Sequence, residues 1–351
     1  MNSQKLDRFN SNSGIEKIDL KKLAKELNLS ISTVSKALRD SWEIKAETKK
    51  RVRDLADKLN YQPNPYASSM RKRKSQTIAV IIPEIANNFF SVVLDGIQVV
   101  AEKKEYHVLT YLTHESYANE LSTIKHLQSG RVDGVLVSLC SETSDNQHLI
   151  RLKETGMPIV FFDRIAELSD CPTVTTDDYV SGYKATEHLI EKGCRAIAFL
   201  SLSQHTSINH KRQQGYIDAL TYNKIKISNR LIIQCGKDND KDKLIIKKLL
   251  TRKNKPDGIF ASVEKLAIAT YHVCNEMKIK IPCDLKIISF SNLRTASLLN
   301  PSLSTVTQPA FDIGKEACEL LFRKIEKKTN KYMNEHPVLK SSLIARSSTA
   351  Q

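Results

Sequence analysis

Short apolar runs that alternate with amphipathic helical segments constrain the fold of this chain most. Residues 77–82 read T-I-A-V-I-I and are closed by Pro83, a pattern typical of a strand buried on both faces. Further candidate strands are 106–111, 134–138, 159–163, 197–201, 258–261 and 287–290. Helical patterns fall between them at 89–104, 117–129, 181–193, 211–222, 240–252 and 264–278. This alternation predicts parallel sheets with right-handed crossovers, the arrangement of an α/β domain.

The alternating region contains two pairs of similar strand sequences, which suggests an internal repeat. The I-A-V-I run at 78–81 is followed 55 residues later by D-G-V-L at 133–136, and I-A-F-L at 197–200 is followed 60 residues later by D-G-I-F at 257–260. We therefore expect two doubly wound parallel-sheet subdomains, similar to those of periplasmic binding proteins. A ligand cleft would lie at the carboxyl ends of their strands. Taken alone, this architecture fits a periplasmic sugar-binding protein, a kinase or a regulator.

Two short helices with a tight turn between them precede this region. Residues 20–27 carry leucine and alanine at helical spacing, with Asp19 as an N-cap and Asn28 suited to the left-handed residue that ends a helix. Ser30 can cap a second helix over 31–38. A third helix, at 47–59, would complete an all-α core. Two helices joined in this way predict a helix-turn-helix unit.

The second helix directs small polar groups outward. Ser32, Thr33, Ser35 and Lys36 lie opposite its apolar face, which is the side-chain set expected for base edges and phosphates in a major groove. Two short amphipathic helices alone would also fit a generic helical domain. The DNA-binding interpretation therefore depends on the segments that follow them.

Positive charge is concentrated in the same region. Residues 1–76 hold 18 Lys/Arg and 9 Asp/Glu, whereas residues 77–351 hold 36 and 30. A merely basic surface would spread the surplus more evenly. The distribution therefore indicates a polyanionic partner for the N-terminal region.

Several function classes are disfavoured. No apolar run is long enough to cross a bilayer, and residues 1–14 lack the apolar segment of a signal peptide, so we expect a cytoplasmic protein that does not engage a membrane. The seven cysteines are scattered and odd in number, which favours free thiols over disulfides or a zinc site. Phosphate-loop, dinucleotide, metalloprotease and serine-hydrolase motifs are absent. We predict no enzyme activity, no catalytic residue, no metal and no cofactor.

The N-terminal segments resemble the LacI/GalR family of bacterial transcription regulators. The resemblance is carried by L-x-x-L-A-x-x-L-x-x-S-x-x-T-V-S-K-A-L at 20–38, L-N-Y-Q-P-N at 59–64 and the linker N-P-Y-A-S-S-M at 64–70. It implies a hinge helix that orders on DNA and inserts Met70, where relatives usually carry leucine, into the minor groove. It implies base reading by Ile31, Ser32 and Lys36. The full set of implied DNA-binding positions is Asp19, Leu20, Ser30, Ile31, Ser32, Thr33, Ser35, Lys36, Arg39, Asn64, Ala67 and Met70.

The resemblance continues through the α/β region. It is carried by I-P-E-I-A-N-N-F-F (82–90), P-I-V-F-F-D-R (158–164), D-D-Y-x-x-G-Y-x-A-T-E-H-L-I (177–190), R-Q-Q-G-Y (212–216) and N-P-S-L-S-T-V-T-Q-P (300–309). The effector-binding residues that it implies are Asn88, Phe89, Phe90, Asp163, Asp177, Arg212, Ser291 and Gln308. The chain departs from the family at Val263-Glu264 and Ser291-Asn292. We therefore expect the pocket to lack acidic or amide groups that are often used on sugars.

These observations predict a transcription regulator that binds a pseudo-palindromic double-stranded operator as a homodimer, and the resemblance implies that it acts as a repressor. We expect a small, sugar-like molecule to control its DNA affinity allosterically. The absence of a heptad tail disfavours a coiled-coil tetramer. The alternatives are a small-molecule binding protein with vestigial DNA binding and a regulator controlled by a protein partner.

The expected domains are a polar disordered arm at 1–16, the helix-turn-helix domain at 17–62, a hinge at 63–76, and a core at 77–351. Within the core we expect an N-subdomain (77–176 and 308–337) and a C-subdomain (177–307 and 338–351).

Overall fold

The computed structural model describes residues 19–61, 74–86, 88–128, 131–202, 206–236, 238–326 and 335–350. The chain divides into two compact units, Met1–Arg73 and Lys74–Gln351. The arm expected at 1–16 and the hinge positions Asn64, Ala67 and Met70 lie outside the described residues.

The first unit is built of three helices, α1 (Leu20–Leu27), α2 (Ile31–Leu38) and α3 (Ala46–Lys58). The predicted caps are confirmed. The Asp19 carboxylate accepts from Lys22 N at 2.9 Å, and Ser30 Oγ accepts from Thr33 N at 3.1 Å. Asn28 ends α1 in the left-handed region, with φ 52°. Apolar side chains from all three helices form one buried cluster, which includes Leu23, Ala24, Val34, Ala37, Val52 and Ala56.

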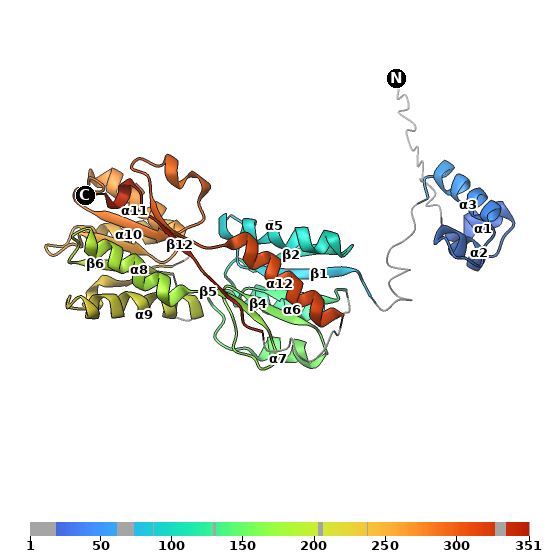
Figure 1. Ribbon diagram of the computed structural model, residues 1–351, viewed down its shortest axis with the longest axis horizontal. Helices are drawn as coiled ribbons and strands as arrows, with labels where there is room; N and C mark the ends of the chain where they lie inside the picture. The colour runs from blue at the N-terminus through green and yellow to red at the C-terminus, as the bar shows by residue number, and fades with distance from the viewer. Residues whose placement is uncertain are drawn as a thin grey trace, which may run out of the picture. The chain divides into compact units, whose positions relative to one another are not determined.

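The second unit contains two α/β subdomains, which form two lobes side by side in Figure 1. The N-subdomain has a six-stranded parallel sheet in the order β11-β5-β4-β3-β1-β2. Its elements are β1 (Thr77–Ile82), α5 (Asn88–Lys103), β2 (His107–Leu112), α6 (Tyr117–Leu127), β3 (Gly134–Val137), α7 (Gln147–Glu154), β4 (Ile159–Phe162), β5 (Thr173–Thr176), α12 (Ala310–Ile325) and β11 (Val338–Leu339).

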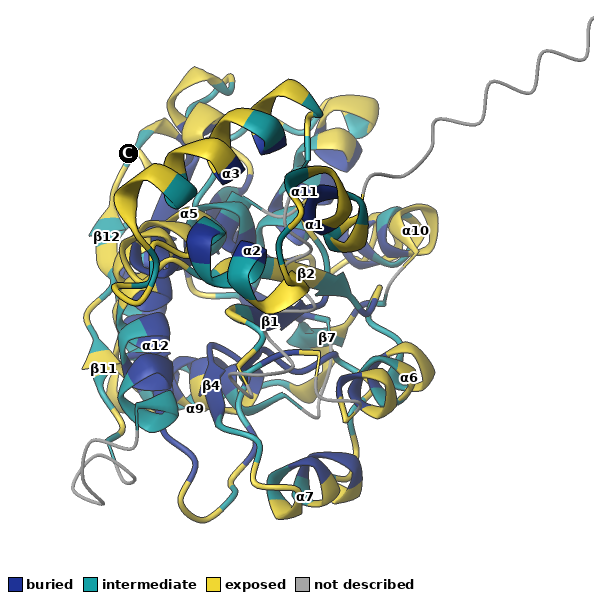
Figure 2. Ribbon diagram, turned by 90° about the vertical axis from the view of Figure 1, so that its right-hand side faces the viewer, coloured by how far each residue is buried: buried dark blue, intermediate teal, exposed yellow. Residues whose placement is uncertain are grey.

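The C-subdomain repeats this plan. Its sheet has the order β12-β10-β9-β8-β6-β7 and is parallel except for the β10–β12 pair. Its elements are α8 (Asp178–Glu191), β6 (Ile197–Ser201), α9 (Ser207–Tyr222), β7 (Ile232–Gln234), α10 (Asn239–Leu250), β8 (Gly258–Ala261), α11 (Glu264–Met277), β9 (Lys286–Phe290), β10 (Ser304–Thr307) and β12 (Ser342–Ile344), with short 3-10 turns at Asn229–Leu231, Arg294–Leu298 and Ser347–Thr349. The central strands are buried and the helices expose only their outer faces, as the colouring of Figure 2 shows.

The chain crosses between the subdomains three times, after β5, after β10 and after β11. The third crossing differs from the expected boundary after residue 337. Val338 and Leu339 pair with Thr175 and Thr176 of β5, so they belong to the N-subdomain. At the other end, Ser75 N donates to the Asp133 carboxylate at 2.7 Å, so the second unit begins before the expected residue 77.

Two helix pairs pack backbone to backbone through glycine. A Cβ on Gly314 of α12 would lie 2.0 Å from Val93 O of α5, and a Cβ on Gly215 of α9 would lie 2.3 Å from Tyr179 O of α8. Any larger side chain would push the helices apart, because close-packed interiors cannot absorb overlaps of this size. The α8–α9 contact matters for function, because α9 carries Arg212.

Several elements were not predicted from the sequence: α7, β5, β7, β10, α12, β11 and β12. The strand predictions relied on continuous apolar runs, but β5 reads T-V-T-T and β10 reads S-T-V-T. Their hydroxyl groups are buried and hydrogen-bonded, as for Ser304 Oγ with Thr349 Oγ1 at 2.7 Å. Burial of such side chains depends on partners that are distant in the sequence.

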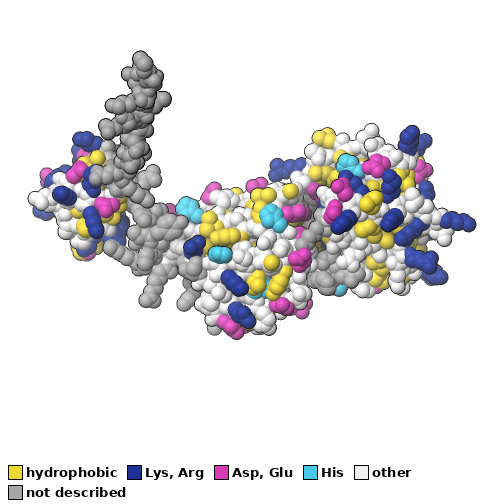
Figure 3. Space-filling view, turned by 180° about the vertical axis from the view of Figure 1, so that it is seen from behind, with side chains coloured by type: hydrophobic (Ala, Val, Ile, Leu, Met, Phe, Trp, Pro, Cys, Tyr) yellow, Lys and Arg dark blue, Asp and Glu magenta, His cyan; other side chains and the backbone are white. Residues whose placement is uncertain are grey.

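The positive charge of the second unit lies mainly in one segment. Residues 222–256 hold 11 Lys/Arg and 3 Asp/Glu, whereas the rest of 77–351 holds 25 and 27. Figure 3 shows Lys and Arg side chains gathered over the end of the C-subdomain. Helices run antiparallel to the strands they follow, so Lys247 and Lys248 in the last turn of α10 lie away from the strand ends that form the cleft. Their charge is therefore not available to a ligand in the cleft.

Candidate functional site

The exposed face of α2 is the candidate nucleic-acid surface of the first unit. Ile31 and Ser32 are exposed, with Ile31 46% accessible despite its apolar side chain. Thr33 is half-buried, and its Oγ1 lies 2.8 Å from Ser30 Oγ, which also lies 2.8 Å from Ser32 Oγ. Hydroxyls at the start of α2 thus form one hydrogen-bonded cluster next to an exposed aliphatic side chain.

Charged side chains frame this face. Lys36 Nζ donates to Glu43 Oε2 in an exposed ion pair, and Arg39 Nε donates to Ser35 O at 3.0 Å. Trp42, the chain's one tryptophan, lies between Arg39 and Glu43 in the sequence and is 90% exposed. An exposed ion pair contributes little to stability, so Lys36 can exchange Glu43 for another anion at small cost.

The other predicted DNA-binding positions of this unit have structural roles in the free protein. Asp19 caps α1, Ser30 caps α2, and Leu20 packs half-buried against the helical core. These roles leave their exposed backbone and side-chain atoms available for phosphate contacts. The roles of these residues in DNA binding remain predictions.

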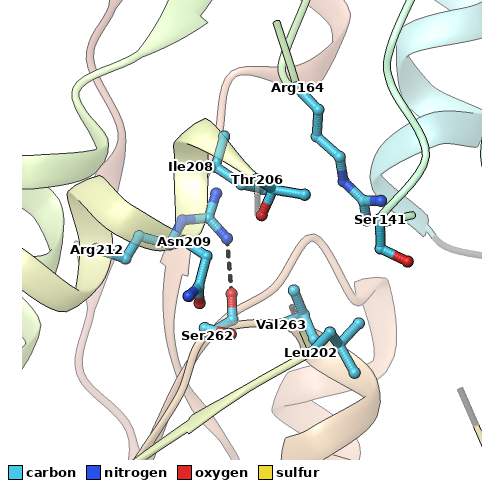
Figure 4. A pocket seen from close by; sticks show the side chains of 9 residues that line it. All are labelled: Ser141, Arg164, Leu202, Thr206, Ile208, Asn209, Arg212, Ser262 and Val263. Atoms are coloured by element: carbon cyan, nitrogen blue, oxygen red, sulfur yellow. Dashed lines mark hydrogen bonds between the residues drawn. The ribbon is translucent and has the colours of Figure 1, made fainter. Parts of the chain in front are cut away.

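The second unit has a cleft between its subdomains that divides into three adjoining pockets. The aromatic pocket is lined by Phe89, Phe90, Asp163, Glu264, Phe290 and Gln308 among others. The arginine pocket is lined by Ser141, Arg164, Thr206, Asn209, Arg212 and Ser262 among others (Figure 4). Arg164, Ile208, Arg212 and Val263 line both. A third pocket, the lysine pocket, includes Lys265 and shares Ser141 and Leu202 with the arginine pocket.

Glu264 joins the two subdomains across the aromatic pocket. Asn88 Nδ2, at the start of α5, donates to Glu264 Oε1 at 2.7 Å, and Ser291 Oγ donates to Glu264 Oε2 at 2.7 Å. The expectation that the pocket lacks acidic and amide groups at these positions was therefore wrong. Glu264 and Asn292 both line the pocket, because the turn after β8 places the residue after Val263 in the cleft.

Arg212 is the most constrained side chain of the cleft. Its Nε donates to Asp178 Oδ1 at 2.7 Å, its Nη1 donates to Ser262 O at 2.6 Å, and its guanidinium carbon lies 3.6 Å from the centre of the Phe290 ring. A Cβ on Gly182 would lie 2.6 Å from Arg212 O, so the close α8–α9 contact also fixes the backbone of Arg212. The guanidinium is buried. Its remaining nitrogen, Nη2, has no hydrogen-bond partner in the described part of the chain.

Arg164 faces the same pocket from the N-subdomain. Its Nη1 donates to both carboxylate oxygens of Glu115, at 2.7 and 2.9 Å. Burial acts to raise the pKa of Glu115, but the charge and hydrogen bonds of Arg164 and the Ser141 N–H outweigh it and hold that pKa below its usual value. The pair is thus ionised at neutral pH. Arg164 Nε lies 3.9 Å from Asp163 Oδ2, beyond hydrogen-bond distance, and within the described ranges it has no hydrogen-bond partner.

Asp163 and Gln308 lie where the chain crosses between the subdomains. Gln308 Nε2 donates to Thr176 Oγ1 at 3.1 Å and lies 3.5 Å from Asp163 Oδ1. Asp163 has a φ of 58°, a backbone conformation that few side chains adopt readily. Burial raises the pKa of its carboxyl, against the opposing effects of Arg164 and Arg212. Asp163 and Gln308 therefore form a buried polar link next to the ligand pockets.

The structure brings most of the predicted effector-binding residues together. Phe89, Phe90, Asp163, Arg212, Ser291 and Gln308 line the aromatic pocket, and Asn88 contacts its wall through Glu264. Asp177 does not line these three pockets but a separate, more open one, together with Tyr179, His210 and Val338 among others. It accepts instead from Ser181 Oγ at 3.0 Å and Ser341 N at 2.8 Å, which ties two crossing segments together.

Sequence reasoning missed Arg164, Asn209 and Glu264 as pocket residues. Arg164 stands in the quoted P-I-V-F-F-D-R segment and could have been found there. Asn209 precedes Arg212 by three residues, so both lie on one face of α9. That register was not visible, because the helix was expected to begin at 211 and begins at Ser207.

Comparisons with known proteins cover both units. Residues 19–64 match the family described as bacterial regulatory proteins, lacI family, and residues 186–349 match the periplasmic binding protein-like domain. Catabolite control protein A of Priestia megaterium is 30% identical over 308 residues, which cover 88% of this chain and 92% of that protein. A transcriptional regulator from Enterococcus faecium, solved with bound ribose, is 26% identical with a TM-score of 0.70, over 78% of this chain and 98% of that one. The lac repressor dimer bound to operator and an anti-inducer matches with a TM-score of 0.81 at 18% identity, over 96% and 100% of the two chains, which is a likeness of fold. In the described part of this chain, the helices are too short or too polar for any of them to span a membrane.

Proposed function

The chain belongs to the LacI family of bacterial regulatory proteins, and on this premise we propose that it is a repressor that binds a pseudo-palindromic operator as a dimer and responds to a small molecule in its cleft. As a member of this family it is a DNA-binding transcription regulator and not an enzyme. The proposal rests on one observation above all. A single chain combines a helix-turn-helix with a cleft whose buried arginines keep hydrogen-bonding atoms without partners.

The face of α2 supports operator binding. Ile31 offers methyl groups that can pack against thymine, Ser32 offers a hydroxyl, and Lys36 offers a long donor for a base edge or phosphate. Thr33 and Ser35 are less exposed and would position the helix on the backbone. Two such units related by a twofold axis would read two half-sites, so the operator should be palindromic.

The cleft supports effector control. The Asn88–Glu264 bond and the Gln308 contacts join the two subdomains at the cleft, so a ligand that rearranges them changes the relative position of the lobes. The backbone N–H groups of Ser75 and Gln76 donate to Asp133 at 2.7 and 2.9 Å. The N-subdomain therefore holds the segment that leads back to the first unit, and its motion can bias DNA binding.

A sugar or sugar derivative is the class of effector that the pockets suit best. Aromatic side chains, carboxylates and amides lie together in the aromatic pocket, and such groups stack on and hydrogen-bond to a hydroxylated ring. The bound ribose in the E. faecium structure agrees with this class. A regulator controlled by a protein partner and a binding protein with vestigial DNA binding are the competing functions.

The decisive experiment maps the bound sites across the genome and then measures affinity for the recovered sequence as salt is varied. We expect a palindromic site and a steep linear fall of log affinity with log salt, since phosphate contacts release counterions. Repeating the measurement with a panel of sugars should change operator affinity for at least one of them. Absence of a palindromic site would favour vestigial DNA binding, and a lack of response to every compound would favour a protein partner.

Removing the ion partner of Lys36 should strengthen DNA binding. We expect Glu43→Gln to bind operator about two- to fivefold more tightly, because Lys36 no longer has to leave a carboxylate and one negative charge near the phosphates is lost. Fluorescence anisotropy of labelled operator measures the effect, and far-UV circular dichroism reports that the helical fold is retained. Glu26→Gln on α1 makes the same charge change at another exposed position. Equal gains in both variants would show that Lys36 is not released.

A further inference from the structure

The cleft contains a compartment suited to an acidic group. Resting on the proposed function, we infer that the effector carries an oxyanion, either a carboxylate or a phosphate, which binds in the arginine pocket between Arg164 and Arg212. The hydroxylated remainder of the molecule would occupy the adjoining aromatic pocket. The effector class is then an acidic sugar derivative and not a neutral sugar.

Unused donors are the first argument. Arg164 Nε, Arg212 Nη2 and Asn209 Nδ2 all belong to side chains that are at least nine-tenths buried, and none has a hydrogen-bond partner among the residues that the structure describes. A buried N–H without an acceptor costs free energy, so protein interiors rarely leave several together. Figure 4 shows Arg164 and Arg212 entering the pocket from opposite sides, with Asn209 beside Arg212. An acceptor group in this pocket would supply partners that these donors lack.

The charges of the pocket are the second argument. Its two ionisable lining residues in the described chain are both arginines, and it is otherwise lined by hydroxyl, amide and aliphatic side chains. Each arginine is hydrogen-bonded to a carboxylate outside this lining set, Glu115 for Arg164 and Asp178 for Arg212. Asp163, in the adjoining aromatic pocket, is the further carboxylate near both arginines, and its Oδ2 lies 3.9 Å from Arg164 Nε. The hydrogen-bonded carboxylates fix the guanidinium orientations and leave Arg164 Nε and Arg212 Nη2 without hydrogen-bond partners in the described chain. Charge-assisted hydrogen bonds to an oxyanion are about twice as strong as neutral ones.

The contrast with the aromatic pocket is the third argument. Arg164 and Arg212 line both pockets, but only the aromatic pocket adds Asp163, Glu264 and Gln308, whose acceptor oxygens suit hydroxyl donors. A neutral sugar presents hydroxyls to both pockets and would leave the strongest donors of the cleft only partly used. A molecule with a hydroxylated ring at one end and an oxyanion at the other matches both compartments.

Calorimetry on the full-length protein tests the inference with matched ligands. The panel pairs glucose, galactose and ribose with glucuronate, galacturonate, glucose 6-phosphate, galactose 6-phosphate and ribose 5-phosphate. We expect at least one acid to bind about tenfold or more tightly than its neutral parent, the value of one additional charged hydrogen bond. The uronate and phosphate arms distinguish the two sources of the oxyanion.

Two variants tie any preference to the pocket. Asn209→Asp should weaken the acid about tenfold or more by charge repulsion and leave the neutral parent nearly unchanged. Neither amide atom of Asn209 has a partner to lose in the described structure. The double variant Arg164→Gln/Glu115→Gln removes both charges of this ion pair, so Glu115 is not left without its partner. It should also reduce the ratio of acid affinity to neutral-parent affinity. Asn254→Asp, on the exposed surface, is the control for the change in net charge.

Several outcomes overturn the inference. Binding of a neutral sugar as tightly as its acid, no binding of any acid, or an acid preference that survives Asn209→Asp would each do so. All three leave operator binding untouched, so the proposed regulator would stand. Failure to bind any palindromic site would overturn the proposed function without changing the calorimetric acid preference.

Discussion

Arg212→Met is expected to abolish effector binding and to lower the free energy of unfolding by about 3–5 kcal/mol. The side chain is 2% exposed, and its loss leaves the Asp178 carboxylate buried without its ion partner. It also removes the donor to Ser262 O and the cation stacked on Phe290. Urea denaturation measures the stability, and calorimetry measures the binding.

The double variant Arg212→Met/Asp178→Asn separates the two effects. Removing both charges should recover most of the lost stability, since a buried ion pair replaced as a whole costs far less than a broken one. Ligand binding should not recover, because the free Nη2 group is still absent. A double variant that binds ligand like the native chain would show that Arg212 supports the fold and does not contact the effector.

Lys36→Ala is expected to weaken operator binding by about 10- to 100-fold, equivalent to about 1–3 kcal/mol for one base-directed contact. Affinity for scrambled DNA of the same length should fall much less, because most phosphate contacts remain. The fold should be almost unaffected, since the Lys36–Glu43 pair that is lost is exposed. Anisotropy titrations with both DNAs measure the specificity ratio.

Lys58→Ala provides the matched control, because it removes the same charge from an exposed position at the end of α3. It should change both DNA affinities slightly and equally. If Lys36→Ala also weakened binding to both DNAs by the same factor, Lys36 would contact a phosphate and not a base. The assignment of base reading would then fall to Ile31 and Ser32 alone.

Much of the first unit could be predicted because its signals are local. A cap acts within one turn of its helix, so Asp19, Asn28 and Ser30 could be assigned from neighbours in the sequence, and the structure agrees. The alternation of buried strands and helices is likewise a local pattern, and it was sufficient for the two-subdomain architecture. Strands rich in threonine, such as β5, were missed because their burial depends on other parts of the chain.

The ligand cleft depended on contacts between residues far apart in the chain. Asp177 and Asp178 are neighbours, yet Asp177 ties crossing segments together while Asp178 orients Arg212. Glu264 meets Asn88 across 176 positions. The sequence by itself determined the family, the helical caps and the doubly wound halves, because short-range periodicity and capping chemistry encode them. Only the tertiary structure decided which carboxylates support the arginines and which buried N–H groups remain for a ligand, because hydrogen-bond satisfaction is a property of the packed chain.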